Sequence, residues 1–195
     1  MGKKALDLRV QRVKIINATE ANAEIYVLGY CIDDSTKKAA DLLDPRLLTS
    51  KIEANINDGD EMTLGPGGIL CYSKHNKDVP QFLSWAIAVY ESDHGVRDFG
   101  AALQQVGKDK RFQTMTSVAA GLLSGGTAAA LAGIAGEVLG IIGSALQLDR
   151  DDQLFMVQDC YDVYLDSTGP KTIRNVVKNN EYVKLAYKLR HLDKP

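Results

Sequence analysis

Cysteine is scarce in this chain, and no two cysteines stand in a Cys-x-x-Cys pair. The three that occur, Cys31, Cys71 and Cys160, lie within apolar or alternating stretches. This spacing gives no indication of a disulfide framework or of a zinc site built from paired cysteines. The pattern predicts buried free thiols in a reducing compartment.

An excess of basic residues is also missing. The chain has 23 Lys and Arg against 25 Asp and Glu, which gives a net charge of −2. Proteins that bind nucleic acid need a concentration of positive charge to neutralise phosphates. The overall balance therefore predicts no nucleic-acid partner.

Targeting and catalytic signals are absent as well. The stretch from Met1 to Lys14 has no apolar segment of the secretory type, so we expect a cytoplasmic protein or one exported by a signal-independent route. The sequence contains no nucleophile-elbow, zinc-protease or P-loop motif. We therefore predict no enzymatic activity. The alternative is an unrecognised hydrolase that uses the polar region from Glu91 to Asp98, which includes His94.

Alternating and apolar runs, separated by turn signals, predict a mainly β fold. Many short strands of this kind are typical of an antiparallel β-sandwich, here of about eight to nine strands. The predicted strands cover 6–15, 24–32, 51–57, 69–73, 82–91, 154–157, 161–165, 172–177 and 182–192.

Three of these strands carry further predictions. In the first, the alternation changes phase near Gln11 and Arg12, which predicts a β-bulge. Residues 24–32 and 82–91 are apolar on both faces, so we expect interior strands that are covered on each side. Trp85, the only tryptophan, should then lie in the core.

A helical insertion interrupts the β pattern. We expect a single domain over 1–195, with the sandwich formed by 5–92 and 153–192 and the insertion by 95–148. A helical period predicts one helix over 95–107. From Phe112 to Gly136 there are 25 residues without a charge, and a break near residues 124–127 divides the following hairpin into arms at 112–123 and 127–147.

The hairpin is rich in glycine, although glycine costs about 1 kcal/mol relative to alanine in a helix interior. Close helix packing is one explanation, and membrane insertion is the other. We expect Gly136 and Gly140 to lie against a neighbouring backbone, and the hairpin is also a candidate contact in a homo-oligomer. Glu137 is unfavourable for a permanent membrane span. The glycines concerned are Gly121, Gly125, Gly133, Gly136, Gly140 and Gly143.

Acidic residues cluster in three of the predicted connections. If the strands run antiparallel in succession, these connections lie at the same end of the sandwich. Calcium takes six to eight oxygen ligands, and crowded carboxylates are costly without a cation. A calcium site is therefore one interpretation, and ordinary solvated turns are the other. The candidate ligands are Asp58, Asp60, Glu91, Asp93, Asp149, Asp151 and Asp152.

A sandwich with acidic end loops resembles C2 domains. The residues that carry this resemblance are 58–61, 91–93 and 149–152, and it concerns the β portion only. The resemblance implies calcium binding in the end loops and docking on membranes.

The leading functional prediction is a binding module for a membrane surface or a protein partner, with calcium as a candidate cofactor. The alternative is a membrane-inserting toxin or effector whose hairpin 112–147 enters the bilayer.

Overall fold

The computed structural model describes residues 4–33, 47–50, 53–76, 79–92, 108–114, 128–147, 152–167 and 169–193. Its strands are β1 Lys4–Ile15, β2 Ala23–Asp33, β3 Leu47–Thr49, β4 Glu53–Ile56, β5 Ile69–His75, β6 Phe82–Glu91, β7 Asp152–Asp162, β8 Lys171–Asn179 and β9 Val183–Asp193. Its named helices are α3 Ala128–Gln147 and α4 Val163–Asp166.

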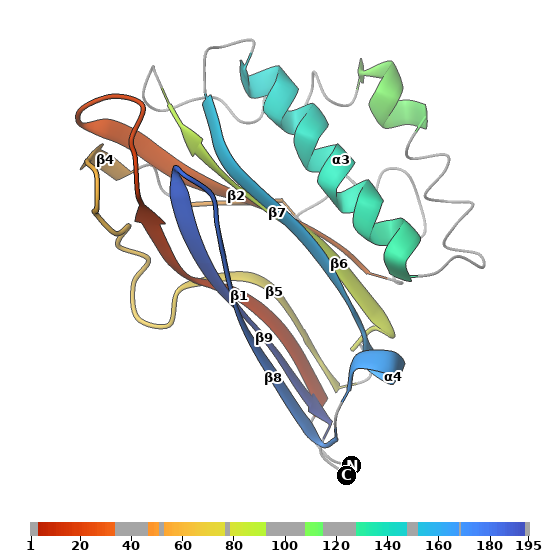
Figure 1. The fold of residues 1–195 in the computed structure, drawn as a ribbon. Coiled ribbons are helices and arrows are strands. Elements are labelled where there is room, and N and C mark those ends of the chain that lie inside the picture. The colour runs from red at the N-terminus through yellow and green to blue at the C-terminus, as the bar shows by residue number, and fades with distance from the viewer. Residues whose placement is uncertain are drawn as a thin grey trace.

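The strands form two antiparallel sheets that pack face to face (Figure 1). The four-stranded sheet has the order β5-β1-β9-β8. The five-stranded sheet has the order β3-β2-β6-β7, and β4 also pairs with β2. The predicted fold class, a mainly β antiparallel sandwich, is confirmed.

Helix α3 adds a third layer on the outer face of the five-stranded sheet (Figure 1). Alternate residues of β2 therefore enter two different cores, since Val27 points between the sheets and Tyr26 points toward α3. Strand β6 is buried on both faces in the same way, and Trp85 is only 1% exposed. The prediction of two covered interior strands is confirmed.

The described part of the hairpin packs on the sheet. Helix α3 coincides with the predicted second arm, and Ala135, Val138 and Leu139 are fully buried against the sheet. From the first arm, Phe112 is buried in the same cluster. Of the helices in the described part of the chain, none combines the length and apolarity that crossing a bilayer requires.

Two glycines let α3 approach the sheet closely. A Cβ atom added at Gly136 would overlap the side-chain amide of Gln158, and one added at Gly143 would overlap the hydroxyl of Tyr90. A Cβ atom at Gly140, by contrast, would have no described heavy atom within 4 Å. Gly136 is therefore buried against a neighbour as predicted, but the contact is with a side chain and not with a backbone. The predicted backbone contact of Gly140 is not found among the described residues.

For the other candidate glycines of the hairpin, the structure gives no contact that tests close packing. Gly133 lies within α3, whereas Gly121 and Gly125 fall outside the described residues. The predicted helix over 95–107 also lies outside them, and the single-domain organisation stays a prediction. Among the described residues, the strands stop at Glu91 and resume at Asp152, close to the predicted limits of the insertion.

The predicted strand over 161–165 is wrong. Strand β7 runs without interruption to Asp162, and the chain then turns into α4. Asp162 starts this turn, because its Oδ1 accepts a hydrogen bond from the backbone N–H of Leu165 at 3.1 Å. A side-chain cap of this kind favours a helical turn over an apolar run of strand type.

Strand β4 also departs from its sequence pattern. Its alternation predicts Ala54 and Ile56 on the same buried side, yet Ala54 is exposed and only Ile56 is buried. Asn55 adopts a left-handed conformation with φ of 62°, and the pairing with β2 shifts register there. The resulting bulge rotates the strand. The bulge predicted in β1 is confirmed by the register shift between Val10 and Arg12.

Candidate functional site

The acidic end of the sandwich is assembled from three connections. Glu91, at the end of β6, pairs in register with Asp152 at the start of β7. The Thr19 hydroxyl donates a hydrogen bond to Glu91 Oε2. The backbone N–H of the neighbouring Ala18 donates to Asp58 Oδ1 at 2.7 Å. The structure therefore places Asp58, Glu91 and Asp152 at one end of the molecule.

The carboxylates at this end hold loop residues by hydrogen bonds. Besides the bonds from Ala18 and Thr19, Asp60 Oδ2 accepts a hydrogen bond from the backbone N–H of Asn57 at 2.9 Å. Gly59 supplies the positive φ, 87°, that the intervening turn requires. Turn formation thus accounts for Asp58 and Asp60 without a ligand.

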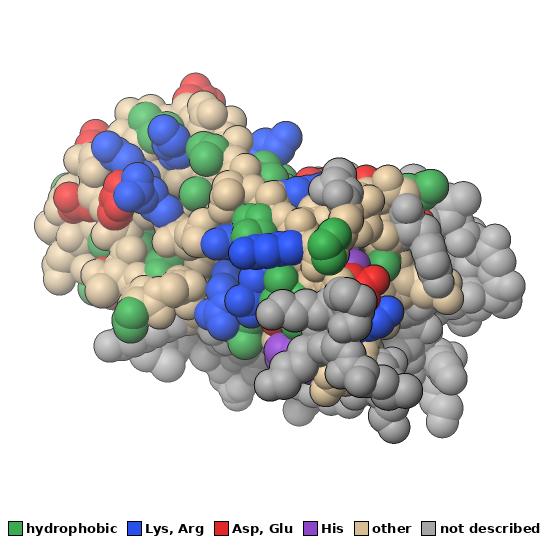
Figure 2. Space-filling view, turned by 90° about the horizontal axis from the view of Figure 1, so that it is seen from below, with side chains coloured by type: hydrophobic (Ala, Val, Ile, Leu, Met, Phe, Trp, Pro, Cys, Tyr) green, Lys and Arg blue, Asp and Glu red, His purple; other side chains and the backbone are tan. Residues whose placement is uncertain are grey.

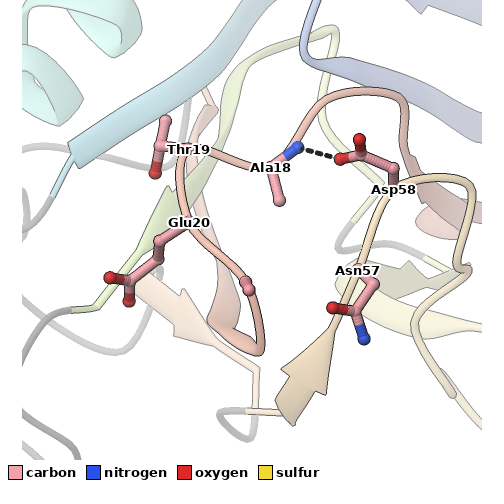
Figure 3. A pocket seen from close by; sticks show the side chains of 6 residues that line it. Ala18, Thr19, Glu20, Asn57 and Asp58 are labelled. Atoms are coloured by element: carbon pink, nitrogen blue, oxygen red, sulfur yellow. Dashed lines mark hydrogen bonds between the residues drawn. The ribbon is translucent and has the colours of Figure 1, made fainter.

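A hollow of about 390 Å³ opens beside these loops (Figure 3). Thr19 and Glu20 line it on one side, and Asn57 and Asp58 line it on the other. The described lining contains two carboxylates and no basic side chain. Its electrostatic character is therefore acidic.

The predicted calcium site is incomplete within the described residues. No group of three or more Asp, Glu, His or Cys side chains there is arranged as a set of metal ligands. Three of the seven predicted ligands, Asp93, Asp149 and Asp151, lie outside the described part of the chain, as does His94. Calcium binding and the hydrolase alternative therefore stay predictions.

A different surface stands out on the outer face of the four-stranded sheet. On β1 and β9, the alternate residues Leu8, Val10, Leu185 and Leu189 are buried between the sheets, so the residues between them point outward. We call this surface the basic face. Its cations on these two strands are Arg9, Arg12, Lys14, Lys184, Lys188 and Arg190. Figure 2 shows Lys and Arg side chains gathered in a band on this side of the molecule.

The acidic residues described on this face are few and already paired. Arg12 forms an ion pair with Glu61 at 3.2 Å. Asp7 is 3% exposed and accepts hydrogen bonds from Arg190, whose Nε lies 3.0 Å from Asp7 Oδ2. The other oxygen of Asp7 accepts a hydrogen bond from the Ser73 hydroxyl at 2.7 Å. The free charge of the face is therefore positive.

Exposed apolar side chains accompany these cations. Leu70 is 41% exposed and lies opposite Arg9 in the pairing of β1 with β5. Ile173, at 39%, lies opposite Arg190 in the pairing of β8 with β9, and Val177, at 54%, lies four residue pairs farther along on the same face. Aromatic side chains of the described strands, such as Tyr72 and Tyr187, point inward instead.

Half of this face follows from the local sequence pattern. The alternation in residues 182–192 predicts Lys184, Lys188 and Arg190 on the outward side, which the structure confirms. The missing half comes from β1, which pairs with β9 over almost its whole length. A signal was present in the cations of residues 9–14, but no local pattern reveals that the two strands are neighbours.

Comparisons with known proteins identify no family. No protein-family profile matches the chain, and no curated protein matches its sequence. Among solved structures, the chain is similar to human GIVD cytosolic phospholipase A2, alone and in complex with methyl gamma-linolenyl fluorophosphonate inhibitor and terbium chloride. The TM-scores are 0.42 and 0.44, each at 10% identity. The superpositions cover 97% of this chain but only 16% and 17% of the phospholipase chain, and at these values the likeness supports no statement about function.

Proposed function

We propose that this chain is a binding module without catalytic activity, and that it engages an anionic membrane surface through the basic face. The observation that carries the proposal is the combination, on one exposed sheet face, of cations from two adjacent strands with Leu70, Ile173 and Val177. The other large sheet face is covered by α3 and is not available for binding.

The positive charge of the basic face favours an anionic bilayer as the partner. A Lys or Arg near an anionic bilayer contributes about 1 kcal/mol, and the attraction falls off within a Debye length. Cations on the same face of two paired strands point to the same side of the sheet, so their contributions add. Exposed apolar side chains contribute further when they enter the interfacial region.

A nucleic acid or an acidic protein would also be attracted by positive charge. Single-stranded nucleic acids are usually held by bases that stack on exposed aromatic rings, and the described strands of the basic face expose none. Aliphatic side chains between cations are better suited to the boundary between headgroups and acyl chains. The membrane surface is therefore the partner that we favour.

The alternative of a membrane-inserting hairpin is less well supported. Helix α3 buries Ala135, Val138 and Leu139 against the five-stranded sheet, and its release would expose that face of the sheet to water. Surface docking through the basic face requires no such rearrangement. It also requires no metal, so calcium dependence, which the resemblance to C2 domains implies, is a separate proposal.

The test is co-sedimentation of the full chain with phosphatidylcholine vesicles that contain phosphatidylserine or lack it. We expect binding only with phosphatidylserine and a steep decline as salt is added. Lys184→Glu should weaken binding at least fivefold, since loss of one cation corresponds to about 1 kcal/mol.

Lys110→Glu is the matched control, because Lys110 is exposed in the helical segment 108–114, on the side of the molecule that carries α3 (Figure 1). Both variants change the net charge equally. Equal weakening by the two would show that net charge alone matters. Absence of vesicle binding, or tighter binding to RNA than to vesicles, would refute the proposed function.

A further inference from the structure

A groove of about 360 Å³ lies within the basic face, on the outer side of the paired strands β1 and β9. Its floor carries Asp7, Arg9, Gln11, Lys188 and Arg190. Pro66 and Gly67, from the connection between β4 and β5, close one side. Three cations and one carboxylate line the groove, so its net charge is +2.

Two of these cations have no acidic partner among the described residues. Arg9 and Lys188 lie directly opposite each other in the register of β1 and β9. Like charges at directly opposed positions destabilise a sheet. The one carboxylate in the groove, Asp7, is already hydrogen-bonded to Arg190 and Ser73, so its charge is balanced mainly by Arg190. An anion in the groove would remove this repulsion.

The third cation is held in place before any ligand arrives. Asp7 is almost fully buried, and it accepts hydrogen bonds from Nε and Nη2 of Arg190. Ser73 Oγ supports Asp7 and also lies 3.0 Å from His75 Nε2. A guanidinium fixed in this way loses little side-chain freedom when it binds an anion.

The side of the groove formed by Pro66 and Gly67 is also held in a fixed position. A Cβ atom at Gly68 would overlap the carbonyl oxygen of Val10, so only glycine permits this close approach to the bulged part of β1. Gly67 and Gly68 both have positive φ, 89° and 75°. The groove is therefore shaped by backbone contacts that cannot shift without disturbing β1.

The chemistry of the lining matches a phosphate group. Guanidinium groups bind phosphate oxygens through paired hydrogen bonds, and a lysine adds a compact charge. A phosphate monoester carries about −1.5 to −2 charge at neutral pH, which balances the +2 of the groove. A phosphodiester or a phosphatidylserine headgroup carries less.

From this geometry we infer that the groove is a binding site for a lipid headgroup with a terminal phosphomonoester, of which phosphatidic acid is the simplest. The inference rests on the proposed function, because the surrounding basic face would bring the groove to the bilayer. Leu70, opposite Arg9, lies beside the site on the neighbouring strand.

Vesicles of equal total charge, made with phosphatidic acid or with phosphatidylglycerol, test the inference on the full chain. The native chain should prefer phosphatidic acid. Arg9→Gln and Lys188→Gln should each reduce that preference about fivefold, since each removes about 1 kcal/mol of attraction to the phosphate. Thermal melting shows whether each variant keeps its fold.

Lys184→Gln is the matched control, since Lys184 lies on the same strand and the same face but outside the groove. It should weaken binding to both vesicle types while leaving the preference intact. Equal binding of the native chain to both lipids would overturn the phosphomonoester site and leave the proposed function standing. Loss of binding to both would overturn the two together.

Competition by inorganic phosphate distinguishes a lipid headgroup from free phosphate as the ligand of the groove. If the lipid is the ligand, phosphate at millimolar concentration should compete weakly with phosphatidic acid vesicles, and sulfate should compete no better. Saturable binding of phosphate in the micromolar range would overturn the assignment to a lipid and identify a site for the free ion.

Discussion

At the scale of single residues, the described core between the sheets contains one buried histidine. His191 is 1% exposed, and its Nδ1 lies 3.0 Å from the Tyr161 hydroxyl. Burial lowers the pKa of His191, and Lys4 acts in the same direction, whereas Asp193 opposes the shift. The neutral imidazole is therefore the form that the folded chain accommodates.

This shift predicts that stability decreases in mild acid. An unfolded histidine has a pKa of about 6.5, so below that pH the unfolded chain binds a proton that the folded chain resists. The His191 contribution is present above about pH 6.5 and is lost as the pH falls through the lowered folded pKa. Thermal melting between neutral and mildly acidic pH measures the effect.

The variant His191→Gln should melt at a lower temperature at neutral pH but show a smaller decrease on acidification. His75→Gln is the control, since His75 lies on the exposed outer face next to Ser73. If the acid sensitivity of His191→Gln equals that of the unchanged chain, another group is responsible.

The cysteines give a second test at this scale. Burial raises the pKa of Cys71 to about 12, so its thiolate is almost absent at neutral pH. Because the thiolate is the reactive form, iodoacetamide should modify Cys71 far more slowly in the folded chain than in the denatured chain. Mass spectrometry of peptides after timed labelling checks this, and equal rates would show that the thiol is accessible.

At the scale of elements, α3 explains why a helix tolerates so many glycines. Its glycines differ in their surroundings: an added Cβ atom at Gly143 would overlap Tyr90, whereas one at Gly140 would have no described heavy atom within 4 Å. Tyr90 is itself fixed, since its hydroxyl donates to Gln153 Oε1 at 2.9 Å. Glycine is therefore required at Gly143, where the helix touches the sheet, whereas no described contact requires it at Gly140.

The two positions predict opposite outcomes for the same substitution. Gly143→Ala should destabilise the fold by about 1–3 kcal/mol, because the added methyl overpacks the contact with Tyr90. Gly140→Ala should stabilise it by up to about 1 kcal/mol through helix propensity. Denaturant unfolding measures both changes, and equal effects of the two substitutions would contradict this account of the helix contact.

Some strands of this fold could be predicted from local sequence pattern, and other elements could not. Strands β2, β6 and β9 were predictable because burial on one or both faces imposes a simple hydrophobic pattern. Strand β4 and helix α4 were not, since Asn55 and Asp162 determine their geometry through a left-handed residue and a side-chain cap. Such effects depend on one residue and leave the surrounding periodicity unchanged.

Of the two candidate sites, the acidic end could be predicted from the sequence better than the basic face. The acidic end could be anticipated in part, because an insertion that returns to the end it left brings the end of β6 beside the start of β7, as the pairing of Glu91 with Asp152 shows. The basic face could not, because Arg9 and Lys188 become neighbours only through the pairing of β1 with β9. Charge counted along the whole chain, −2, conceals a surface of the opposite sign.

At the scale of the whole molecule, the charges are segregated. The hollow at the acidic end is lined by Glu20 and Asp58, with no cation in its described lining. The groove of the basic face, by contrast, has a net charge of +2. A molecule with this distribution is oriented in the field of a charged surface before contact. The basic face should therefore meet an anionic bilayer first.

The acidic end supplies a test for calcium. If Asp93, Asp149 and Asp151 join Asp58 and Glu91 around a metal, calcium at about one hundred times its dissociation constant should stabilise the fold by about 2.7 kcal/mol. Magnesium should do less, since it releases its water ligands reluctantly. Melting in calcium, in magnesium and in chelator measures the difference.

The variant Asp151→Asn should reduce the calcium effect without changing the melting temperature in chelator. Lys110→Gln, a change away from the acidic end, serves as its control. A melting temperature that does not respond to millimolar calcium would end the calcium hypothesis and leave turn formation as the role of these carboxylates.

The pairing of β1 with β9 has a consequence for biosynthesis. Ile15 and Val183 are partners in this pairing, so the ribosome must make the whole intervening fold before β1 can acquire its central neighbour. Until then Leu6, Leu8 and Val10 of β1 lack part of their packing, and incompletely buried apolar surface of this kind is prone to aggregate. The five-stranded sheet and α3 can assemble earlier, since their strands all precede β8. The surface that we assign to binding is therefore completed last, and a chain released before β9 is made would be unable to dock.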